Sequence, residues 1–207
     1  MIELQNIKKS FGNRILFEKL NLTIENGEFL ILKSESGCGK TTLLNILGGL
    51  EDVDLGKILI DGKDISANTN QMWLYGEKIG FLFQNFALVE HKTVRQNLEM
   101  IKKKYRSDKS PETALSEVGL SDKKDSKVFT LSGGEQQRVA LARLMVKKCD
   151  IILADEPTGS LDRKNAANVI ELLQKLNHDG KTVVMGTHDE IYQNIGTRHT
   201  EISEFSS

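Results

Sequence analysis

Three features of this 207-residue sequence predict an α/β fold built on a mainly parallel sheet. From Gly134 onwards, segments typical of helices and of buried strands alternate, which is the pattern of a sheet covered by helices on both faces. A Gly-rich loop follows the apolar run Phe29–Leu32 and precedes a short helical segment. Residues 85–145 are helix-rich and interrupt the alternation, so we interpret them as an inserted helical subdomain.

The composition excludes several classes of protein. Hydrophobic residues make up 39% of the chain, enough for the core of one large domain, and the net charge of -1 gives no electrostatic attraction for nucleic acid. No apolar run reaches the roughly 18 residues that a membrane-spanning helix needs. The first residues lack the apolar segment of a signal peptide, which predicts a cytosolic location. Cys38 and Cys149 have no metal-ligand spacing, so we expect two reduced thiols.

The first part of the chain contains strand patterns and one short helix. Two strands joined by a tight hairpin turn at Asn26-Gly27 are expected from NLTIENGEFLIL. A short helix that ends at Gly48-Gly49 is expected from TTLLNILGGL. A strand with a turn at Asp61-Gly62 follows in GKILIDGKDI, and KIGFLFQ predicts a buried strand that stops at Gln84.

The middle of the chain has the pattern of helices. Apolar residues from Val94 to Tyr105 follow helical spacing in TVRQNLEMIKKKY. A second helix is marked by Ser110 as N-cap, Pro111 at the first helical position and Gly119 at its end. The charged run KKKYRSDK between them is expected to be a solvated helix end and loop. Further along, strand patterns in DIILAD and KTVVMGTH flank a helical KNAANVIELLQKL.

The loop SESGCGKTT, residues 34–42, has the context of a phosphate-binding loop because it joins a buried strand to a helix. Its glycines let the backbone approach phosphate oxygens, Lys40 can reach the β- and γ-phosphates, and the Thr41 hydroxyl can ligate Mg²⁺. The usual pattern has Gly where this chain has Ser34. This difference affects the first position of the loop and not the phosphate-binding residues that follow it. The alternative is a flexible Gly-rich turn, and the Lys-Thr pair with its flanks argues against it.

Two acidic residues close a central strand in IILADEP. Ligands of open α/β sheets bind at the carboxyl ends of the strands, so Asp155 and Glu156 are candidates for a ligand site. Asp155 suits Mg²⁺ binding through water, and Glu156 suits polarising an attacking water. An exposed acidic turn that caps the next helix is the alternative interpretation.

Three further residues are candidates through their positions. His188 follows an apolar strand at the same edge of the sheet, whereas the other three histidines lie in polar surroundings. Gln84 ends another strand there, and its amide can orient water or contact Mg²⁺. Phe11 precedes a turn, and its position alone is more typical of a core aromatic residue than of a ligand-binding one.

A second anion-binding helix start is predicted in LSGGEQQ, residues 131–137. The first N–H groups of a helix lack intrahelical partners, and the helix dipole adds about half a positive charge there. Ser132, Gly133 and Gly134 precede a segment with helical character. The chain therefore offers two phosphate sites that are far apart in sequence, and this needs an explanation.

In order and spacing, these motifs resemble the nucleotide-binding subunit of ATP-binding cassette (ABC) transporters over nearly the whole chain. SESGCGKTT is similar to the Walker A loop, LSGGEQQ to the family signature, IILADEP to Walker B, GSLD to the D-loop and THD to the switch-histidine loop. LSGGEQQ is the specific element, because many other P-loop proteins share the first motif. The resemblance implies a P-loop NTPase core with an N-terminal antiparallel β subdomain, over about 1–84 and 146–207. The helical subdomain would cover about 85–145.

The resemblance also implies roles for individual residues. Phe11 would stack on adenine, Gln84 would couple to a membrane partner, and Asp162 would belong to the D-loop. The catalytic residues would be Glu156, His188 and Gln84. The Mg²⁺ ligands would be Thr41, Gln84 and Asp155. The nucleotide would contact Phe11, Ser34, Glu35, Ser36, Gly37, Cys38, Gly39, Lys40, Thr41 and Thr42. The signature that acts on the other chain would be Leu131, Ser132, Gly133, Gly134, Glu135 and Gln136.

An ATPase that drives a transporter is the function that the resemblance implies. Two chains would form a head-to-tail homodimer in which the signature of each closes on ATP held by the Walker A loop of the other, which explains the two anion sites. A separate integral membrane permease would bind the dimer at the inner face of the cell membrane. GFLFQNFALVEHKTVRQNLEM and ADEPTGSLD resemble the branch that includes lipoprotein-release, macrolide-export, cell-division and bacteriocin-export ATPases. We expect export of an antimicrobial peptide, bacteriocin or similar substrate.

Two other functions use the same motifs. A regulatory scaffold of the cell-division type would transmit a signal across the membrane without transport, and only the identity of the membrane partner distinguishes it. A DNA-repair ATPase would carry long coiled coils or zinc modules. The interval between Lys40 and Ser132 has no heptad run, and the cysteines form no zinc site. We therefore expect no nucleic-acid partner.

Overall fold

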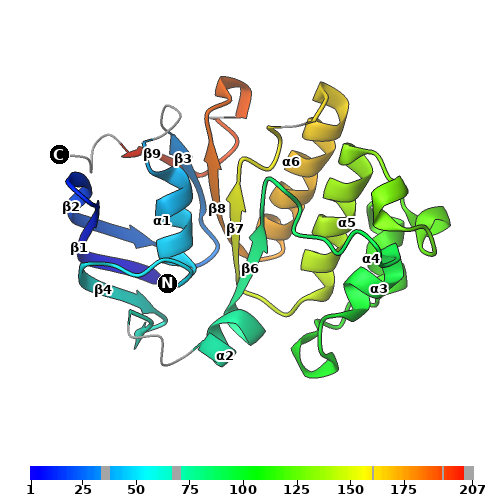
Figure 1. Cartoon of the computed structure of the whole chain (residues 1–207), viewed down its shortest axis with the longest axis horizontal. Coiled ribbons are helices and arrows are strands. Elements are labelled where there is room, and N and C mark those ends of the chain that lie inside the picture. The colour runs from blue at the N-terminus through cyan, green and yellow to red at the C-terminus, as the bar shows by residue number, and fades with distance from the viewer. Residues whose placement is uncertain (34–37, 67–70, 160, 193, 203–207) are drawn as a thin grey trace.

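The fold has a central parallel sheet between an antiparallel sheet on one side and a group of helices on the other (Figure 1). It is seen in a computed structural model that describes residues 1–33, 38–66, 71–159, 161–192 and 194–202. One hydrophobic core lies between the parallel sheet and the helices α3 to α6, and a second lies between the two sheets around α1. The predicted α/β class with a parallel sheet is confirmed.

The antiparallel sheet is built from the N-terminal part of the chain. Its order is β2-β1-β4-β5, and its strands are β1 (Ile2–Phe11), β2 (Arg14–Ile24), β4 (Leu55–Ile60) and β5 (Lys63–Asp64). Asp61 and Gly62 between β4 and β5 have φ values of 49° and 74°, the left-handed conformation of a two-residue hairpin turn. The predicted turn and the N-terminal antiparallel β unit are confirmed.

The predicted hairpin at Asn26-Gly27 is wrong. The turn exists, but β2 pairs with β1, whereas β3 (Phe29–Lys33) enters the parallel sheet between β8 and β9. Distant residues hold Gly27, because its N–H donates to the Thr182 hydroxyl at 3.0 Å and its carbonyl accepts from the Asn177 amide at 2.9 Å. The physical reason lies in β3, which is apolar on both faces and therefore belongs in the middle of a sheet.

The parallel sheet has the order β6-β7-β8-β3-β9. The remaining strands are β6 (Ile79–Leu82), β7 (Ile151–Asp155), β8 (Thr182–Thr187) and β9 (Arg198–Glu201). Alternate residues serve the two cores: Phe29 and Ile31 face the helices, and Leu30 and Leu32 face α1 and the antiparallel sheet. Because all pairings are parallel, the carboxyl ends of these strands meet at one edge.

Six α-helices lie in the described residues. They are α1 (Lys40–Leu47), α2 (Gln71–Trp73), α3 (Val94–Glu99), α4 (Pro111–Glu117), α5 (Gly133–Val146) and α6 (Arg163–His178). The signals at Ser110 and Pro111 are confirmed, since the Ser110 side chain accepts from the Thr113 N–H and Pro111 begins α4. No helix among the described residues is both long and apolar enough to cross a membrane.

The predicted helix through Tyr105 is too long, because α3 ends at Glu99 and only a short 3₁₀ turn follows at Lys103–Tyr105. The guanidinium of Arg106 donates to the carbonyls of Glu99 at 2.9 Å and of Ile101 at 2.8 Å. These carbonyls are thus satisfied by a side chain rather than by the N–H groups of a further helical turn.

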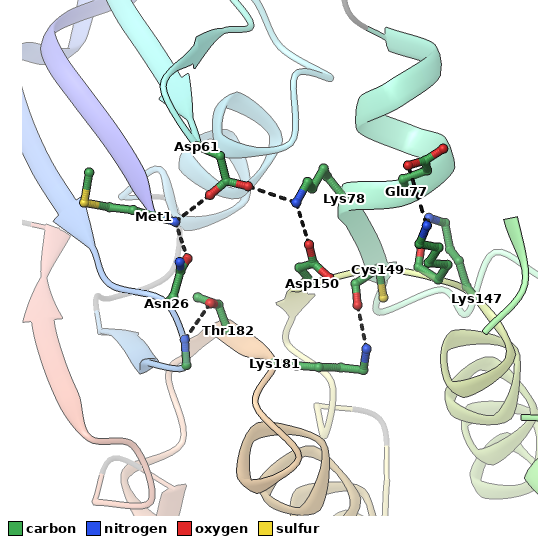
Figure 2. A network of polar contacts seen from close by, with 12 residues as sticks. Met1, Asn26, Asp61, Glu77, Lys78, Lys147, Cys149, Asp150, Lys181 and Thr182 are labelled. Carbon is green, nitrogen blue, oxygen red and sulfur yellow. Dashed lines mark hydrogen bonds and ion pairs between the residues drawn. The ribbon is translucent and has the colours of Figure 1, made fainter. Parts of the chain in front are cut away.

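An ion-pair network joins the two sheets (Figure 2). The Lys78 ammonium lies 2.9 Å from the Asp61 carboxylate in the β4–β5 turn and 2.6 Å from the Asp150 carboxylate, next to the start of β7. These hydrogen bonds, first that to Asp150, hold the pKa of Lys78 above its ordinary value. The antiparallel sheet is thereby held against the parallel sheet at the edge opposite the strand carboxyl ends.

Candidate active site

A cavity of about 430 Å³ opens at the carboxyl edge of the parallel sheet and extends to the tip of β1 and β2. Most of its lining was expected from the sequence, although the residues come from five separate segments. The lining residues are Phe11, Arg14, Leu16, Gly39, Lys40, Thr41, Thr42, Gln84, Glu156 and His188. Arg14 and Leu16 were not expected at the site, and the signal for Arg14 in the sequence is the Gly12-Asn13 turn, which pairs Arg14 with Phe11 across the hairpin.

The N-terminus of α1 contributes the phosphate-binding candidates. Gly39 has a φ of 101°, which only glycine adopts without strain, and it immediately precedes Lys40, the first residue of the helix. Lys40 is buried although it is charged. The Thr41 hydroxyl donates to Asp155 Oδ2 at 2.8 Å. Cys38 is half-buried beside them, while Ser34, Glu35, Ser36 and Gly37 lie outside the described residues.

Asp155 ends β7 with a carboxylate that lacks part of its expected bonding. Its Oδ1 is buried and has no hydrogen-bond partner among the described residues. Burial raises the pKa of this carboxyl above its ordinary value, although the Thr41 hydroxyl partly opposes the change. A buried carboxylate oxygen beside a threonine hydroxyl is an oxygen set of the kind that Mg²⁺ prefers. The residues present therefore fit a Mg²⁺ ion.

Glu156 has a strained backbone with a φ of 43°, a conformation that costs a residue other than glycine roughly 1–2 kcal/mol. Its Oε1 lies 2.8 Å from His188 Nδ1 and 3.7 Å from the Lys40 ammonium. Its Oε2 is buried and has no hydrogen-bond partner among the described residues. The carboxylate thus lines the cavity between a cation and an imidazole, with one oxygen available for a water molecule.

Phe11 lines the cavity from the end of β1 and is 52% exposed, so it is not a core residue. The Lys9 ammonium lies 4.8 Å from its ring centroid, a cation–π distance. Lys9 is itself held by Glu51 Oε1 at 2.5 Å and by the Asp52 carbonyl at 2.8 Å. The ring is therefore supported on one side by the protein, and it still has a large surface available for a planar ligand.

The signature residues lie elsewhere. None of the residues 131–136 is among the described residues that line the cavity. Ser132 is the N-cap of α5 and forms a capping box, in which its hydroxyl accepts from the Glu135 N–H at 3.3 Å and its N–H donates to Glu135 Oε2 at 2.8 Å. Ser132 and Gly133 are exposed, while Leu131 and Gly134 are buried. The second helix start is thus well formed and open to solvent.

Comparison with known proteins identifies the class. A family model described as "ABC transporter" matches residues 17–159, more than half of the chain, and the chain therefore belongs to the ABC transporter family. Its class is that of ABC ATPases, which bind ATP and hydrolyse it to ADP and phosphate.

Particular relatives fall in the branch that the sequence predicted. The macrolide export ATP-binding/permease protein MacB of Campylobacter jejuni is 40% identical over 196 residues, which are 91% of this chain and 31% of MacB. This chain thus spans about a third of the length of that relative. The lipoprotein-releasing system ATP-binding protein LolD of Aquifex aeolicus is 36% identical over 211 residues, which are 99% of this chain and 94% of LolD.

A solved structure has the same fold. The ATP-binding cassette MJ0796, in a dimeric post-hydrolysis state bound to ADP and Pi, matches with a TM-score of 0.85 and 37% identity. The match covers 97% of this chain and 94% of that one. At this level of identity and coverage, the likeness extends to the sheets and the helices together.

Proposed function

We propose that two copies of this chain form a head-to-tail dimer that binds two ATP molecules between them and drives a membrane partner. The observation that carries the proposal is the separation of two helix N-termini suited to phosphate. The start of α1 lines the cavity, whereas the exposed start of α5 does not. A second copy can supply its own α5 to the nucleotide held by the first. The dimeric state of MJ0796 with ADP and Pi supports the formation of a dimer.

The polar residues in and beside the cavity then have chemical tasks. Lys40 neutralises charge on the β- and γ-phosphates, and Glu156 polarises the attacking water. Thr41 and Asp155 would hold Mg²⁺, with Gln84 beside them, and the ion would neutralise charge on the phosphate oxygens. His188, 2.8 Å from Glu156 Oε1, orients that carboxylate and lies toward the γ-phosphate.

The lining residues from β1 and β2 suit the base of the nucleotide. Phe11 offers an aromatic face on which adenine stacks. Leu16 adds an apolar surface to the lining, and Arg14 adds a positive charge. The division into a catalytic core and a helical subdomain of about residues 85–145 belongs to the same proposal. It places the cavity in the catalytic core and the signature in the helical subdomain.

The membrane partner is proposed to bind at a second cavity of about 540 Å³ between α2 and the segment after α3. The exposed apolar side chains of Met72 and Met100 line it together with Lys102 and Lys104. This combination fits an amphipathic helix with acidic residues. The chain would then be peripheral on the inner face of the membrane. The match to nearly the full length of LolD supports a permease on a separate chain.

The direction and cargo of transport are the finer parts of the proposal. Macrolide export is the activity named for MacB, and lipoprotein release is the activity named for LolD. Export is therefore the direction we propose here. An antimicrobial peptide or bacteriocin as cargo stays a prediction from the sequence.

The shared site is tested by mixing two inactive variants, Lys40→Ala and Gly133→Asp. Gly133 is chosen because an added Cβ meets nothing within 4 Å in its own chain. In the heterodimer one composite site carries both changes and the other carries neither, so turnover should recover to as much as about half per heterodimer if the sites act independently. The formation of heterodimers in ATP is measured alongside. If folded variants show neither turnover nor heterodimers, the shared site is wrong.

The docking cavity has its own test. Met100→Asp should reduce the fraction of the chain that sediments with membranes of its source cells, because it places a charge in an apolar contact. Leu55→Asp is the matched control, since Leu55 is 64% exposed and lies on β4, outside this cavity. Equal sedimentation of the two variants would argue against the cavity as the docking site.

A further inference from the structure

The helix that begins with the signature also contacts the segment that follows Glu156. Gln137 on α5 is completely buried, and its Nε2 donates to the Pro157 carbonyl at 2.8 Å. Pro157 comes directly after Glu156. A buried amide that donates to this carbonyl fixes the position of α5 relative to the backbone of the carboxylate that faces the attacking water.

The backbone around Glu156 is held at two other points. The Glu156 N–H donates to the Gly186 carbonyl at 2.9 Å, and the Glu156 carbonyl accepts from the Gly159 N–H at 3.1 Å. These bonds support the left-handed conformation of Glu156. The Gln137 bond is the one that comes from the signature helix. A shift of α5 along its axis therefore acts on the backbone at Pro157, one residue after Glu156.

A second contact joins the same helix to the D-loop. Arg138 Nη1 donates to Asn165 Oδ1 at 2.6 Å, and Asn165 Nδ2 donates to Asp162 Oδ2 at 2.7 Å. The Asn165 N–H also donates to Asp162 Oδ1 at 2.9 Å, and these bonds hold the pKa of Asp162 below its ordinary value. A Cβ added to Gly134 would lie only 2.6–2.8 Å from the Cγ, Nδ2 and Oδ1 atoms of Asn165, so the Asn165 amide leaves no room for it.

We propose that Gln137 and Asn165 are positioning residues that couple the two ATP sites of the dimer. The inference rests on the proposed head-to-tail arrangement. There, the signature of one chain binds the ATP held by its partner, while Glu156 of that same chain acts on its own ATP. Through Gln137 and Asn165, a movement of the signature helix of one chain also moves Glu156 and Asp162 of that chain. Binding of ATP at one site therefore sets the position of Glu156 and Asp162 at the other site.

The coupling predicts a kinetic effect that a purely structural role of these residues would not produce. Two coupled sites give a sigmoidal dependence of turnover on ATP concentration, with a Hill coefficient that approaches about 2, the number of sites. Breaking the link should bring the Hill coefficient towards 1. Neither residue lines the nucleotide cavity, so ATP affinity of the separate chains should stay the same.

The test uses Gln137→Met on α5 and Asn165→Ala on α6. Asn168→Ala, also on α6, is the matched control for Asn165→Ala. Turnover is measured over a range of ATP concentrations, and thermal unfolding establishes that each variant is folded. We expect the two variants to lose the sigmoidal shape, with a Hill coefficient near 1 instead of about 2, and to have a lower maximal turnover. Asn168→Ala should keep both.

Exchange of donor and acceptor provides a rescue. Asn165→Asp places two carboxylates against each other and should lower both turnover and the Hill coefficient. Adding Asp162→Asn restores a donor and an acceptor across the same 2.7 Å contact, so the double variant should recover relative to Asn165→Asp alone. Asp162→Asn by itself completes the cycle.

The outcomes separate this inference from the proposal on which it rests. Unchanged maximal turnover and Hill coefficient in the folded Gln137 and Asn165 variants, with Gly133→Asp inactive, would overturn the coupling and leave the shared site intact. Full activity of Gly133→Asp would instead overturn the shared site, and the coupling with it. Lost activity without rescue in the double variant would also count against the hydrogen bond as the link.

Discussion

Adding one methyl group at two adjacent glycines should have opposite effects on stability. Gly133 and Gly134 begin α5, and at Gly133 an added Cβ meets nothing within 4 Å. At Gly134 it would lie 2.6 Å from Asn165 Cγ and 2.8 Å from both Asn165 Nδ2 and Oδ1. This amide cannot easily move, because Arg138 and Asp162 hold it at 2.6 and 2.7 Å.

The magnitudes follow from these contacts. Gly133→Ala should stabilise the protein by up to about 1 kcal/mol, because alanine loses less backbone entropy in a helix. Gly134→Ala has the same gain but adds overpacking of about 1–3 kcal/mol. The two variants should therefore differ by about 2 kcal/mol, which corresponds to roughly 4–8 °C in Tm for a domain of this size.

The assay is thermal unfolding of both variants side by side, without nucleotide, followed by ATP turnover. Gly133→Ala should be the more stable protein and yet lose at least about tenfold in turnover, about 1.4 kcal/mol, because its methyl group faces the nucleotide of the partner. Equal Tm values would refute the packing argument at Gly134. A stable and fully active Gly133→Ala would refute the role of this helix start in trans.

Three further outcomes are expected. Glu156→Gln should keep ATP binding, slow hydrolysis by about 10²-fold or more and accumulate as an ATP-bound dimer on size exclusion; near-normal turnover would remove Glu156 as the base. Lys40→Ala should weaken Mg-ATP binding in calorimetric titration, and unchanged affinity would exclude the start of α1 as the phosphate site. Lys109 and Lys175 hold the pKa of Glu117 below 4.5, so this carboxylate stabilises the fold above that pH, and its effect is lost as the pH falls through the lowered pKa. Glu117→Gln should thus cost about 0.5–1 kcal/mol at neutral pH and nothing in acid; a loss of stability that is independent of pH would contradict the ion pairs.

Local signals in the sequence determined much of the fold. Pro111 and Ser110 set the start of α4 through interactions within one helical turn, and Gly48-Gly49 ended α1 as predicted. The alternation of strands and helices was enough to predict the parallel sheet. It also placed Gln84 and Glu156 at one edge, because strands that run in parallel end on the same side.

Other features depended on residues far away in the chain. The turn at Asn26-Gly27 has a hairpin sequence, but contacts from Asn177 and Thr182 direct the chain into the other sheet. The pattern of α3 continues past Glu99, and the guanidinium of Arg106 ends it. A periodicity reports which face of a segment is apolar, and it contains no information about the partner that covers that face.

The site divides in the same way. Residue types and spacing identified Lys40, Thr41, Asp155 and Glu156, because phosphate and Mg²⁺ chemistry restricts the side chains that can serve. Only the tertiary structure showed that a Cβ at Gly134 would lie 2.6–2.8 Å from the Asn165 amide. A short sequence motif indicates which side chains the chemistry requires. The residues that pack against those side chains come from distant parts of the chain, so no local motif predicts them.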